Sequence, residues 1–230
     1  MEKKKKTLLA IAAHPDDLEF GCSMIVRKLI NEGYTAYYLI ATTGENGCKK
    51  NIKTRKERIE VRRKEQLNAA KKLGVKEVIF WNERDGFLEY TDNLRKKLTL
   101  IIKKIKPEYV FTFDPANQQF DNLNLFHKDH RIISLAAFDA CFAAKNDFIY
   151  PSKYGLHRVN KIFFFGSDKP NFFLNISKDI DIKLDILSSH TSQFSDFDEF
   201  TDYFKKFIAS DSKKYKYSES FRVIDVIKIT

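Results

Sequence analysis

The first half of the chain alternates short apolar runs with longer amphipathic stretches. A short apolar run bounded by turn residues is typical of a buried strand, and apolar positions three and four apart are typical of a helix. Strands are predicted at 7–13, 34–42, 75–81 and 108–114, and helices at 19–32, 53–73, 92–104 and 126–144. Because strands and helices alternate, we expect an α/β protein with a Rossmann-like three-layer α/β/α fold and a mainly parallel sheet.

The pattern is less regular in the last third of the chain. It predicts strands at 161–165, 172–176 and 221–229, and helices at 179–189 and 196–209. Gly74 directly follows the second helix, as a C-cap glycine does, and Asp92 is in position to cap the third. No repeat, low-complexity tract or linker interrupts the sequence, so we expect a single domain over residues 1–230.

Polar residues directly follow the first predicted strand, at His14, Pro15, Asp16 and Asp17. In open parallel sheets, ligands bind beyond the carboxyl ends of the strands. Two adjacent carboxylates beside a histidine are costly to bury together, and a bound divalent cation removes this conflict. On its own the turn has a simpler interpretation, in which Asp16 or Asp17 caps a helix by accepting backbone N–H bonds.

A second cluster of ionisable residues, His127, Lys128, Asp129 and His130, lies in the fourth predicted helix. Its two histidines are three positions apart and therefore share one face of that helix. By itself such a pattern more often marks a solvated helix face. Combined with the first cluster, two histidines and one carboxylate leave an open fourth position, as in a catalytic zinc site, and Fe(II) suits the same donors.

The two clusters also carry a family resemblance. Segments 13–19 (AHPDDLE) and 127–130 (HKDH) resemble motifs of the PIG-L/LmbE-like family of zinc-dependent N-deacetylases. Supporting matches extend the resemblance over about residues 7–223, and they include Arg62, Glu65 and the segments 43–47, 85–86, 110–115, 190–193 and 219–221. The resemblance implies an LmbE-like deacetylase domain that removes the N-acetyl group from an N-acetylglucosamine-type sugar or glycoconjugate. By analogy it also implies a homo-oligomer.

The resemblance assigns the metal site to residues of both clusters. The zinc ligands that it implies are His14, Asp17 and His130, and Asp16 becomes the general base that takes a proton from the attacking water. Zinc lowers the pKa of bound water to about 7 and polarises the amide carbonyl. Hydrolysis then releases acetate and leaves an amine on the sugar.

The same resemblance assigns the remaining roles. His127 stabilises the oxyanion or protonates the leaving amine, and Asp129 tunes that histidine. The implied substrate-binding residues are Arg62, Asp85 and His190. The sequence departs from the family pattern at Ser23 and Met24, which replace a common glycine pair and would crowd a close approach of their helix. Lys128 replaces a frequent proline, but no implied ligand is lost.

The chain is basic, with 41 Lys and Arg against 31 Asp and Glu and a formal net charge of +10. This charge makes a nucleic-acid-binding protein a second hypothesis, because basic residues are dense in the predicted helix at 53–73. Glu57, Glu60 and Glu65 interleave with them, which favours a solvated helix face, and no nucleic-acid-binding motif is present. A positive surface also suits the attraction of an anionic substrate.

Composition sets the remaining expectations. Cys22, Cys48 and Cys141 are odd in number and widely spaced, so they form neither a disulfide framework nor a paired zinc motif. We therefore expect a reducing, cytoplasmic location. With 43% hydrophobic and 31% charged residues, the composition is that of a soluble globular protein without membrane insertion. The expected partners are a small-molecule amino-sugar substrate and further copies of the chain, not nucleic acid.

Overall fold

The fold is built on a seven-stranded sheet with the order β3-β2-β1-β4-β5-β7-β6. The computed structural model describes residues 6–48, 51–117, 119–120, 122–211 and 214–226. The strands are β1 (Thr7–Ala12), β2 (Thr35–Thr42), β3 (Glu77–Glu83), β4 (Tyr109–Phe113), β5 (Lys161–Phe165), β6 (Phe172–Asn175) and β7 (Ser218–Asp225). Neighbours among β1 to β5 pair in parallel, and β7 is antiparallel to β5 and β6. The predicted α/β fold with a mainly parallel sheet is confirmed.

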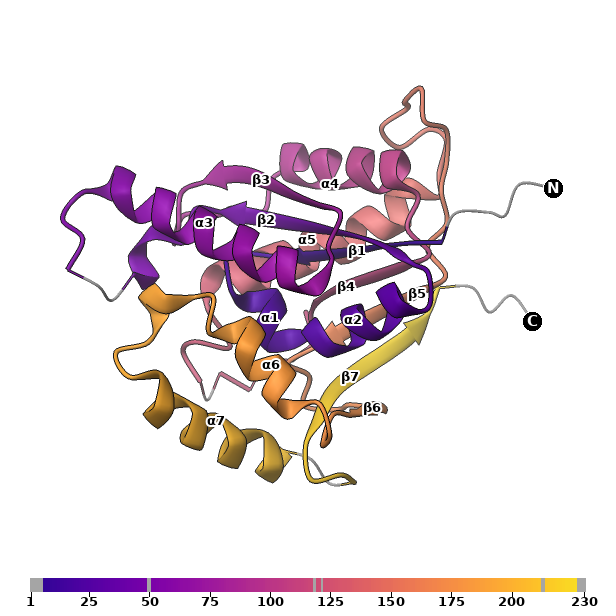
Figure 1. Cartoon of the computed structure of the whole chain (residues 1–230). Helices are drawn as coiled ribbons and strands as arrows, with labels where there is room; N and C mark the ends of the chain where they lie inside the picture. The colour runs from indigo at the N-terminus through magenta and orange to yellow at the C-terminus, as the bar shows by residue number, and fades with distance from the viewer. Residues whose placement is uncertain (1–5, 49–50, 118, 121, 212–213, 227–230) are drawn as a thin grey trace.

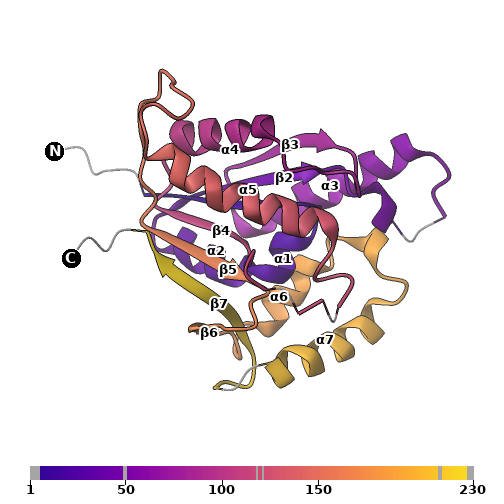
Figure 2. The same ribbon diagram turned by 180° about the vertical axis from the view of Figure 1, so that it is seen from behind.

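Helices cover both faces of this sheet (Figure 1 and Figure 2). One face carries α1 (Asp17–Gly21), α2 (Ser23–Asn31), α3 (Arg55–Leu73) and α6 (Ile180–Leu187). The other face carries α4 (Asp92–Ile105) and α5 (Lys128–Ala144), and α7 (Phe197–Asp211) packs near β7. Two short 3₁₀ turns, η1 (Glu45–Gly47) and η2 (Thr191–Gln193), complete the elements. No helix within the described ranges is long and apolar enough to cross a membrane.

Strands β1 and β4 mark the point where the strand order reverses. They pair side by side, whereas the chain leaves β1 for β2 on one side and β4 for β5 on the other. All residues of β1 are buried, because helices cover it on both faces. The crevice beyond the carboxyl ends of β1 and β4 is therefore the expected ligand-binding position of this fold.

The predicted helix at 19–32 is divided into α1 and α2 at Cys22. The Lys183 ammonium donates to the carbonyls of Glu19 and Phe20, at 3.0 and 2.9 Å. The Glu219 carboxylate accepts two backbone N–H groups at the start of α2, at 2.9 Å each. Lys183 and Glu219 form a buried 2.6 Å ion pair, so residues from the last third of the chain satisfy both helix ends created by the break.

Several predicted boundaries differ from the observed ones. Helix α4 is capped by Thr91, whose hydroxyl accepts the Leu94 N–H at 3.1 Å, and Asp92 is its first residue. Strand β7 begins at Ser218, before the predicted start, because β6 pairs with residues 218–221. Residues 227–229 of that predicted strand lie outside the described residues. Gly74 ends α3 in the left-handed conformation, with φ of 81°, as predicted.

Candidate active site

Donor atoms of three side chains from two distant segments converge in the crevice between β1 and β4. His14 Nδ1 lies 3.0 Å from His130 Nε2, and Asp17 Oδ1 lies 3.2 Å from that same His130 nitrogen. Asp17 Oδ2 is 3.5 Å from His14 Nδ1. Donors at zinc-binding distance in a tetrahedral site are about 3.3 to 3.6 Å apart. Of the three observed distances, 3.5 Å lies within this range and 3.0 and 3.2 Å lie slightly below it, so the three side chains are close enough to share one small cation.

The other nitrogen of each histidine ring faces an acceptor. His130 Nδ1 is 3.2 Å from the Leu125 carbonyl oxygen. His14 Nε2 is 3.1 Å from Asp85 Oδ1 and 3.4 Å from Asp129 Oδ2. Histidines that bind metals usually donate their second ring N–H to a carbonyl or carboxylate, which orients the ring and sets its tautomer. This arrangement leaves His14 Nδ1 and His130 Nε2 as the metal-facing nitrogens.

Two further sets of possible ligands also include His14. The donor atoms of His14, His127 and His130 lie within 4.8 Å of one another, as do those of His14, Asp85 and Asp129. The rings of His14 and His127 meet edge to face, with centroids 4.8 Å apart. His14 is common to every donor set described here, and it is the centre of the cluster.

The electrostatics of the cluster favour positive charge at His14. Burial by itself lowers the pKa of His14, but the carboxylates of Asp17, Asp129 and Asp85 outweigh burial and raise it well above its usual range. For Asp17 the effects have the opposite sign. Burial by itself raises the pKa of Asp17, but the neighbouring His14 and His130 outweigh burial and lower this pKa strongly. A group of buried carboxylates that favours a positive centre is the electrostatic setting of a cation site.

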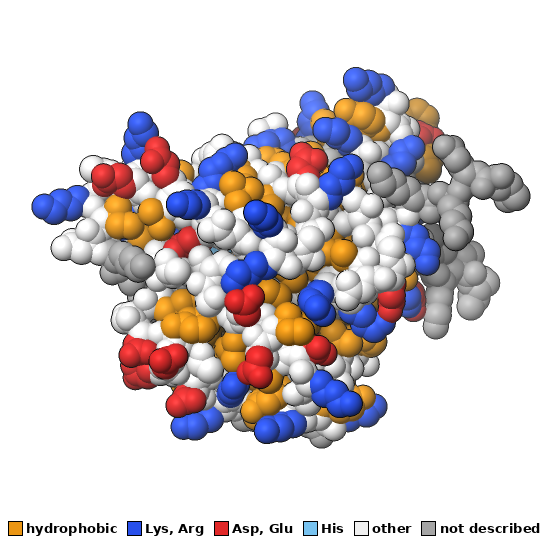
Figure 3. Space-filling view, in the orientation of Figure 1, with side chains coloured by type: hydrophobic (Ala, Val, Ile, Leu, Met, Phe, Trp, Pro, Cys, Tyr) orange, Lys and Arg blue, Asp and Glu red, His pale blue; other side chains and the backbone are white. Residues whose placement is uncertain are grey.

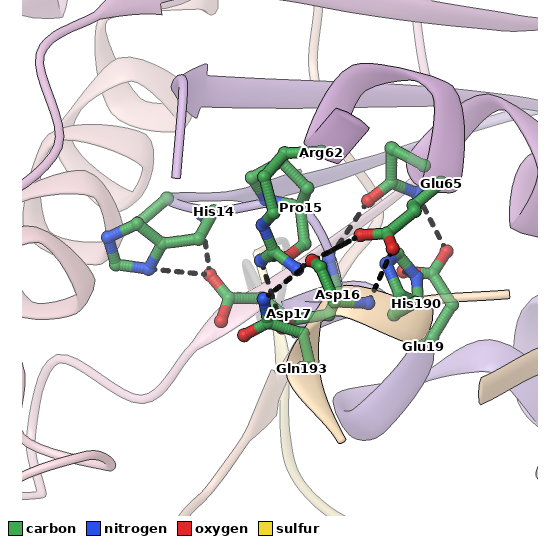
Figure 4. Close-up of polar contacts among 12 residues, drawn as sticks. His14, Pro15, Asp16, Asp17, Glu19, Arg62, Glu65, His190 and Gln193 are labelled. Atoms are coloured by element: carbon green, nitrogen blue, oxygen red, sulfur yellow. Dashed lines mark hydrogen bonds and ion pairs between the residues drawn. The ribbon is translucent and has the colours of Figure 1, made fainter. Parts of the chain in front are cut away.

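Asp16 lies beside this cluster in an uncommon backbone conformation. Its φ is 100°, in the region that favours glycine. Its carboxylate makes no capping bond to α1, so the simple N-cap interpretation of Asp16 is wrong. Instead Arg62 Nη2 donates to Asp16 Oδ2 at 3.0 Å and also to the Pro15 carbonyl. Arg62 is only 2% exposed, and Figure 4 shows it extending from α3 towards the turn.

The second cluster forms the start of α5, as the predicted helix at 126–144 implied. Helix α5 begins at Lys128, and His127 is its N-cap, with Nδ1 accepting the Asp129 N–H at 3.2 Å. The Asp129 carboxylate accepts the N–H groups of Gly86 and Leu88, at 2.7 and 3.1 Å. It thus points to the 86–88 loop and to His14. Burial and the positive charges of His14 and His130 lower the pKa of His127, although Asp129 and Asp85 oppose this shift.

Of the three predicted substrate-binding residues, Asp85 contacts His14, Arg62 contacts Asp16, and His190 lies in the core beside Glu19. Asp85 is 4% exposed, accepts the Asn46 N–H at 2.9 Å and faces His14. His190 is fully buried, with Nε2 3.1 Å from Glu19 Oε2 (Figure 4). Arg62 and His190 are thus held by other protein groups. Their assignment to substrate binding stays a prediction.

Sequence reasoning missed Gln66, which the structure brings to the Asp16 turn. Gln66 accepts the Asp16 N–H through Oε1 at 3.0 Å and donates to Glu19 Oε1 at 2.8 Å. A usable signal was present, because Gln66 precedes Ala69, Ala70 and Leu73 at the spacing of a buried helix face. A fully buried glutamine on that face requires polar partners. Ser23, where crowding was predicted, is buried, and its hydroxyl donates to the Glu19 carbonyl at 2.9 Å.

The fold and the site together define a class of protein. Histidines and carboxylates that converge at the topological switch point of an α/β sheet form an enzyme active site with a candidate metal centre. The sequence profile of the PIG-L family, described as GlcNAc-PI de-N-acetylase, matches residues 9–141, more than half of the chain. The chain belongs to the PIG-L family.

Named relatives are similar over most of the chain. The diacetylchitobiose deacetylase of Thermococcus kodakarensis is 31% identical over 193 residues, which cover 82% of this chain and 70% of that protein. A Bacillus cereus protein named "Probable N-acetyl-alpha-D-glucosaminyl L-malate deacetylase 2" is 27% identical, with 82% and 84% covered. The structure of N,N'-diacetylchitobiose deacetylase from Pyrococcus horikoshii has a TM-score of 0.87 at 28% identity, covering 96% of this chain and 84% of that one. The chain is a hydrolase of the N-deacetylase class.

Proposed function

We propose that this protein removes the acetyl group from an N-acetylglucosamine-type sugar or glycoconjugate, using zinc held by His14, Asp17 and His130. The observation that carries the proposal is the convergence of their donor atoms, 3.0 to 3.5 Å apart, beside the Asp16 turn. The substrate class is supported by relatives named for diacetylchitobiose and for N-acetylglucosaminyl malate.

Zinc, when bound, supplies Lewis acidity for the amide carbonyl and a water molecule that ionises near neutral pH. Asp16 accepts the proton of the attacking water, and Arg62 orients the Asp16 carboxylate through a 3.0 Å hydrogen bond. His127 uses Nδ1 to accept the Asp129 N–H, so Nε2 is left to serve the substrate. We assign to that nitrogen the stabilisation of the oxyanion or the protonation of the leaving amine.

The remaining catalytic residue, Asp129, acts through neighbouring groups. Asp129 faces His14 at 3.4 Å and lies close enough to His127 to oppose the lowering of the His127 pKa. Asp129 therefore tunes both histidines. Asp85 and Arg62 line the turn that a sugar hydroxyl would approach, and His190 supports that turn from the core.

Fe(II) is the alternative metal, because two histidines and one carboxylate also suit that ion. A different N-acyl substrate would accompany this alternative. Metal analysis of protein purified without oxygen separates the two, with about one zinc per chain expected.

A nucleic-acid-binding function receives less support. Lys and Arg side chains are scattered among Asp and Glu over the face that Figure 3 shows. On α3, Arg62 is buried against Asp16, and Arg55 pairs with Glu45 at 2.7 Å. These basic residues are occupied within the protein. Attraction of an anionic substrate by the net charge of +10 remains part of the proposal.

The proposal includes three expectations about the protein as a whole. We place it in the cytoplasm on the basis of its cysteine usage, and we treat residues 1–230 as one catalytic domain because a single sheet joins both halves. The homo-oligomer rests on the family resemblance. Mass photometry of the purified protein tests the last of these expectations.

The decisive experiment measures acetate release by Asp16→Asn. We expect kcat to fall by about 10² to 10⁴-fold, the usual contribution of a general base, while the bound metal stays at the wild-type amount. Substrates to be tested are N-acetylglucosamine, diacetylchitobiose and malate-linked N-acetylglucosamine. Asp181→Asn makes the same chemical change at a carboxylate that is 86% exposed and serves as the control. Wild-type kcat in Asp16→Asn would refute the mechanism.

A further inference from the structure

A chain of buried hydrogen bonds runs from the Asp16 backbone into the core. The Asp16 N–H donates to Gln66 Oε1 at 3.0 Å, and Gln66 Nε2 donates to Glu19 Oε1 at 2.8 Å. Glu19 Oε2 then lies 3.1 Å from His190 Nε2. Gln66, Glu19 and His190 are all 0% exposed. Figure 4 shows Glu19 and His190 together on the side of Asp16 that faces away from His14.

The directions of these hydrogen bonds require a side chain at position 66 that both accepts and donates. A backbone N–H can only donate and an ionised carboxylate can only accept, so the side chain between them must accept at one end and donate at the other. A carboxamide does both, and Gln66 has the length to span the gap. Leucine at this position would do neither, and glutamate would place two carboxylates together.

The same helix face holds Asp16 at a second point. Arg62 and Gln66 are four residues apart on α3 and therefore adjacent on its surface. Arg62 binds the Asp16 carboxylate at 3.0 Å, and Gln66 binds the Asp16 backbone. A non-glycine residue at φ of 100° is strained, and such conformations persist where surrounding contacts enforce them.

We propose that Gln66 is a positioning residue of the active site, and that the chain through Glu19 and His190 holds it in the required orientation. Gln66 keeps the Asp16 backbone in its left-handed conformation and thereby aims the Asp16 carboxylate at the attacking water. The inference rests on the proposed function, because Gln66 acts only through Asp16. In this proposal Gln66 neither binds the metal nor contacts the substrate. Among the described residues it has no bond to His14, Asp17 or His130.

The first test is Gln66→Leu, which keeps the size of the side chain and removes both hydrogen bonds. We expect kcat to fall by about 10 to 100-fold, since a misplacement of about 1 Å in a catalytic group costs up to about 100-fold. KM and the bound metal per chain should stay within about twofold of wild type. Loss of metal in this variant, or a rise in KM that accounts for the whole effect, would overturn the inference.

The second test exchanges the two side chains of the central hydrogen bond. Gln66→Glu alone, assayed at pH 8, places a carboxylate at position 66 against the Glu19 carboxylate and should lower kcat. Adding Glu19→Gln restores all three hydrogen bonds. The carboxylate at position 66 accepts the Asp16 N–H, and the carboxamide at position 19 donates to that carboxylate. His190 then donates to the carboxamide oxygen at position 19. We expect the double variant to recover most of the wild-type kcat. A double variant that folds and is no better than Gln66→Glu contradicts the inference.

A control separates positioning from general stability. Lys103 is 1% exposed and donates to the carbonyls of Asn146, Ile149 and Tyr150, far from the site. Lys103→Met should lower Tm and leave kcat at the assay temperature unchanged. If Gln66→Leu has wild-type kcat while Asp16→Asn is inactive, the inference fails and the proposed function stands. If Asp16→Asn is active, the proposed mechanism itself fails.

Discussion

His14 connects the proposed metal site to its surroundings through two chemically distinct nitrogens. Nδ1 faces His130 and Asp17, whereas Nε2 faces the carboxylates of Asp85 and Asp129. The two carboxylates favour a proton on Nε2, so the lone pair of the neutral ring is on Nδ1. The position of this lone pair decides whether the three donors can bind a cation at all.

Asp85→Asn therefore tests the support of a single histidine. The substitution removes negative charge next to His14 Nε2, 3.1 Å away, and keeps the size of the side chain. We expect metal affinity or kcat/KM to fall by about 10 to 100-fold, as is usual for partners of metal-binding histidines. Titration of the apoprotein with zinc measures the affinity. Asp185→Asn, at a carboxylate 66% exposed, is the control, and equal behaviour of the two variants would contradict the assignment.

The sequence identified the ionisable residues of the site more readily than their partners. His14, Asp16 and Asp17 follow a strand directly, and the HKDH cluster adds His127, Asp129 and His130, so chemistry and position could be inferred together. Which group each side chain faces was not predictable. Asp129 was expected to serve His127, but its carboxylate also lies 3.4 Å from His14, because the 86–88 loop binds it from the other side.

The ends of β1, β4 and α5 meet at the site, together with the middle of α3. Strand β1 ends before His14, α5 begins after His127, and α3 contributes a polar patch of Arg62, Glu65 and Gln66 within a buried face. Strand β4 ends at Phe113, whose ring stacks on His130 with centroids 4.0 Å apart. The position of the end of β4 thus affects the orientation of His130, a proposed metal ligand.

The loop after β4 is held to β7 by an ion pair between Asp114 and Arg222. The guanidinium donates twice, at 2.7 and 2.6 Å, to a carboxylate that is fully buried. Burial by itself raises the pKa of Asp114, but the hydrogen bonds from Arg222, Ser167 and the Ala116 N–H outweigh it and lower the pKa below its ordinary range. The pair thus stabilises the folded state when Asp114 is ionised.

Arg222→Met should destabilise the protein by an amount that depends on pH. Because the folded-state pKa of Asp114 is lowered, the stabilisation is complete above the unfolded-state value of about 3.9 and is lost as the pH falls through the lower folded-state pKa. The difference in unfolding free energy between wild type and Arg222→Met should therefore be largest near pH 7 and shrink below about pH 4. Urea unfolding at several pH values measures it.

Lys161→Met provides the matched comparison. Lys161 pairs with Asp225 at 2.6 Å. The two side chains are 40% and 42% exposed, respectively, so solvent screens the pair. Its effect on stability should be small and nearly independent of pH. A destabilisation by Arg222→Met that stays constant from pH 7 to pH 3 would show that lost packing, and not the charge of Asp114, is responsible.

At the scale of the whole molecule, a bound cation would join segments that are far apart in the sequence. His14 and His130 are separated by 116 positions and come from opposite sides of the β1–β4 boundary. A ligand that binds only the folded state raises the unfolding free energy by RT ln(1 + [L]/Kd). Metal binding is therefore expected to affect stability as well as activity.

Removal of metal with a chelator should abolish acetate release and lower Tm. Restoring zinc to about 1,000 times Kd adds about 4 kcal/mol, which corresponds to about 8 to 16 °C in Tm for a chain of this size. His130→Ala should lose this zinc-dependent shift. His157→Ala should keep it, because His157 binds the Pro107 carbonyl at 2.7 Å, at the opposite end of the sheet. A Tm of wild type that is insensitive to zinc would contradict the metal site.

By itself the sequence determined the parallel α/β sheet and the chemistry available at its edge. Apolar runs that alternate with amphipathic stretches have few ways to bury their surface, and the residue types after β1 and β4 are local information. Only the tertiary structure decided the break at Cys22, the direction of the Asp129 carboxylate and the role of Gln66. Each depends on hydrogen bonds or ion pairs between side chains and partners distant in sequence, such as the 171 positions between Glu19 and His190. No local pattern encodes which of several buried polar groups will meet, because packing of the whole chain selects their partners.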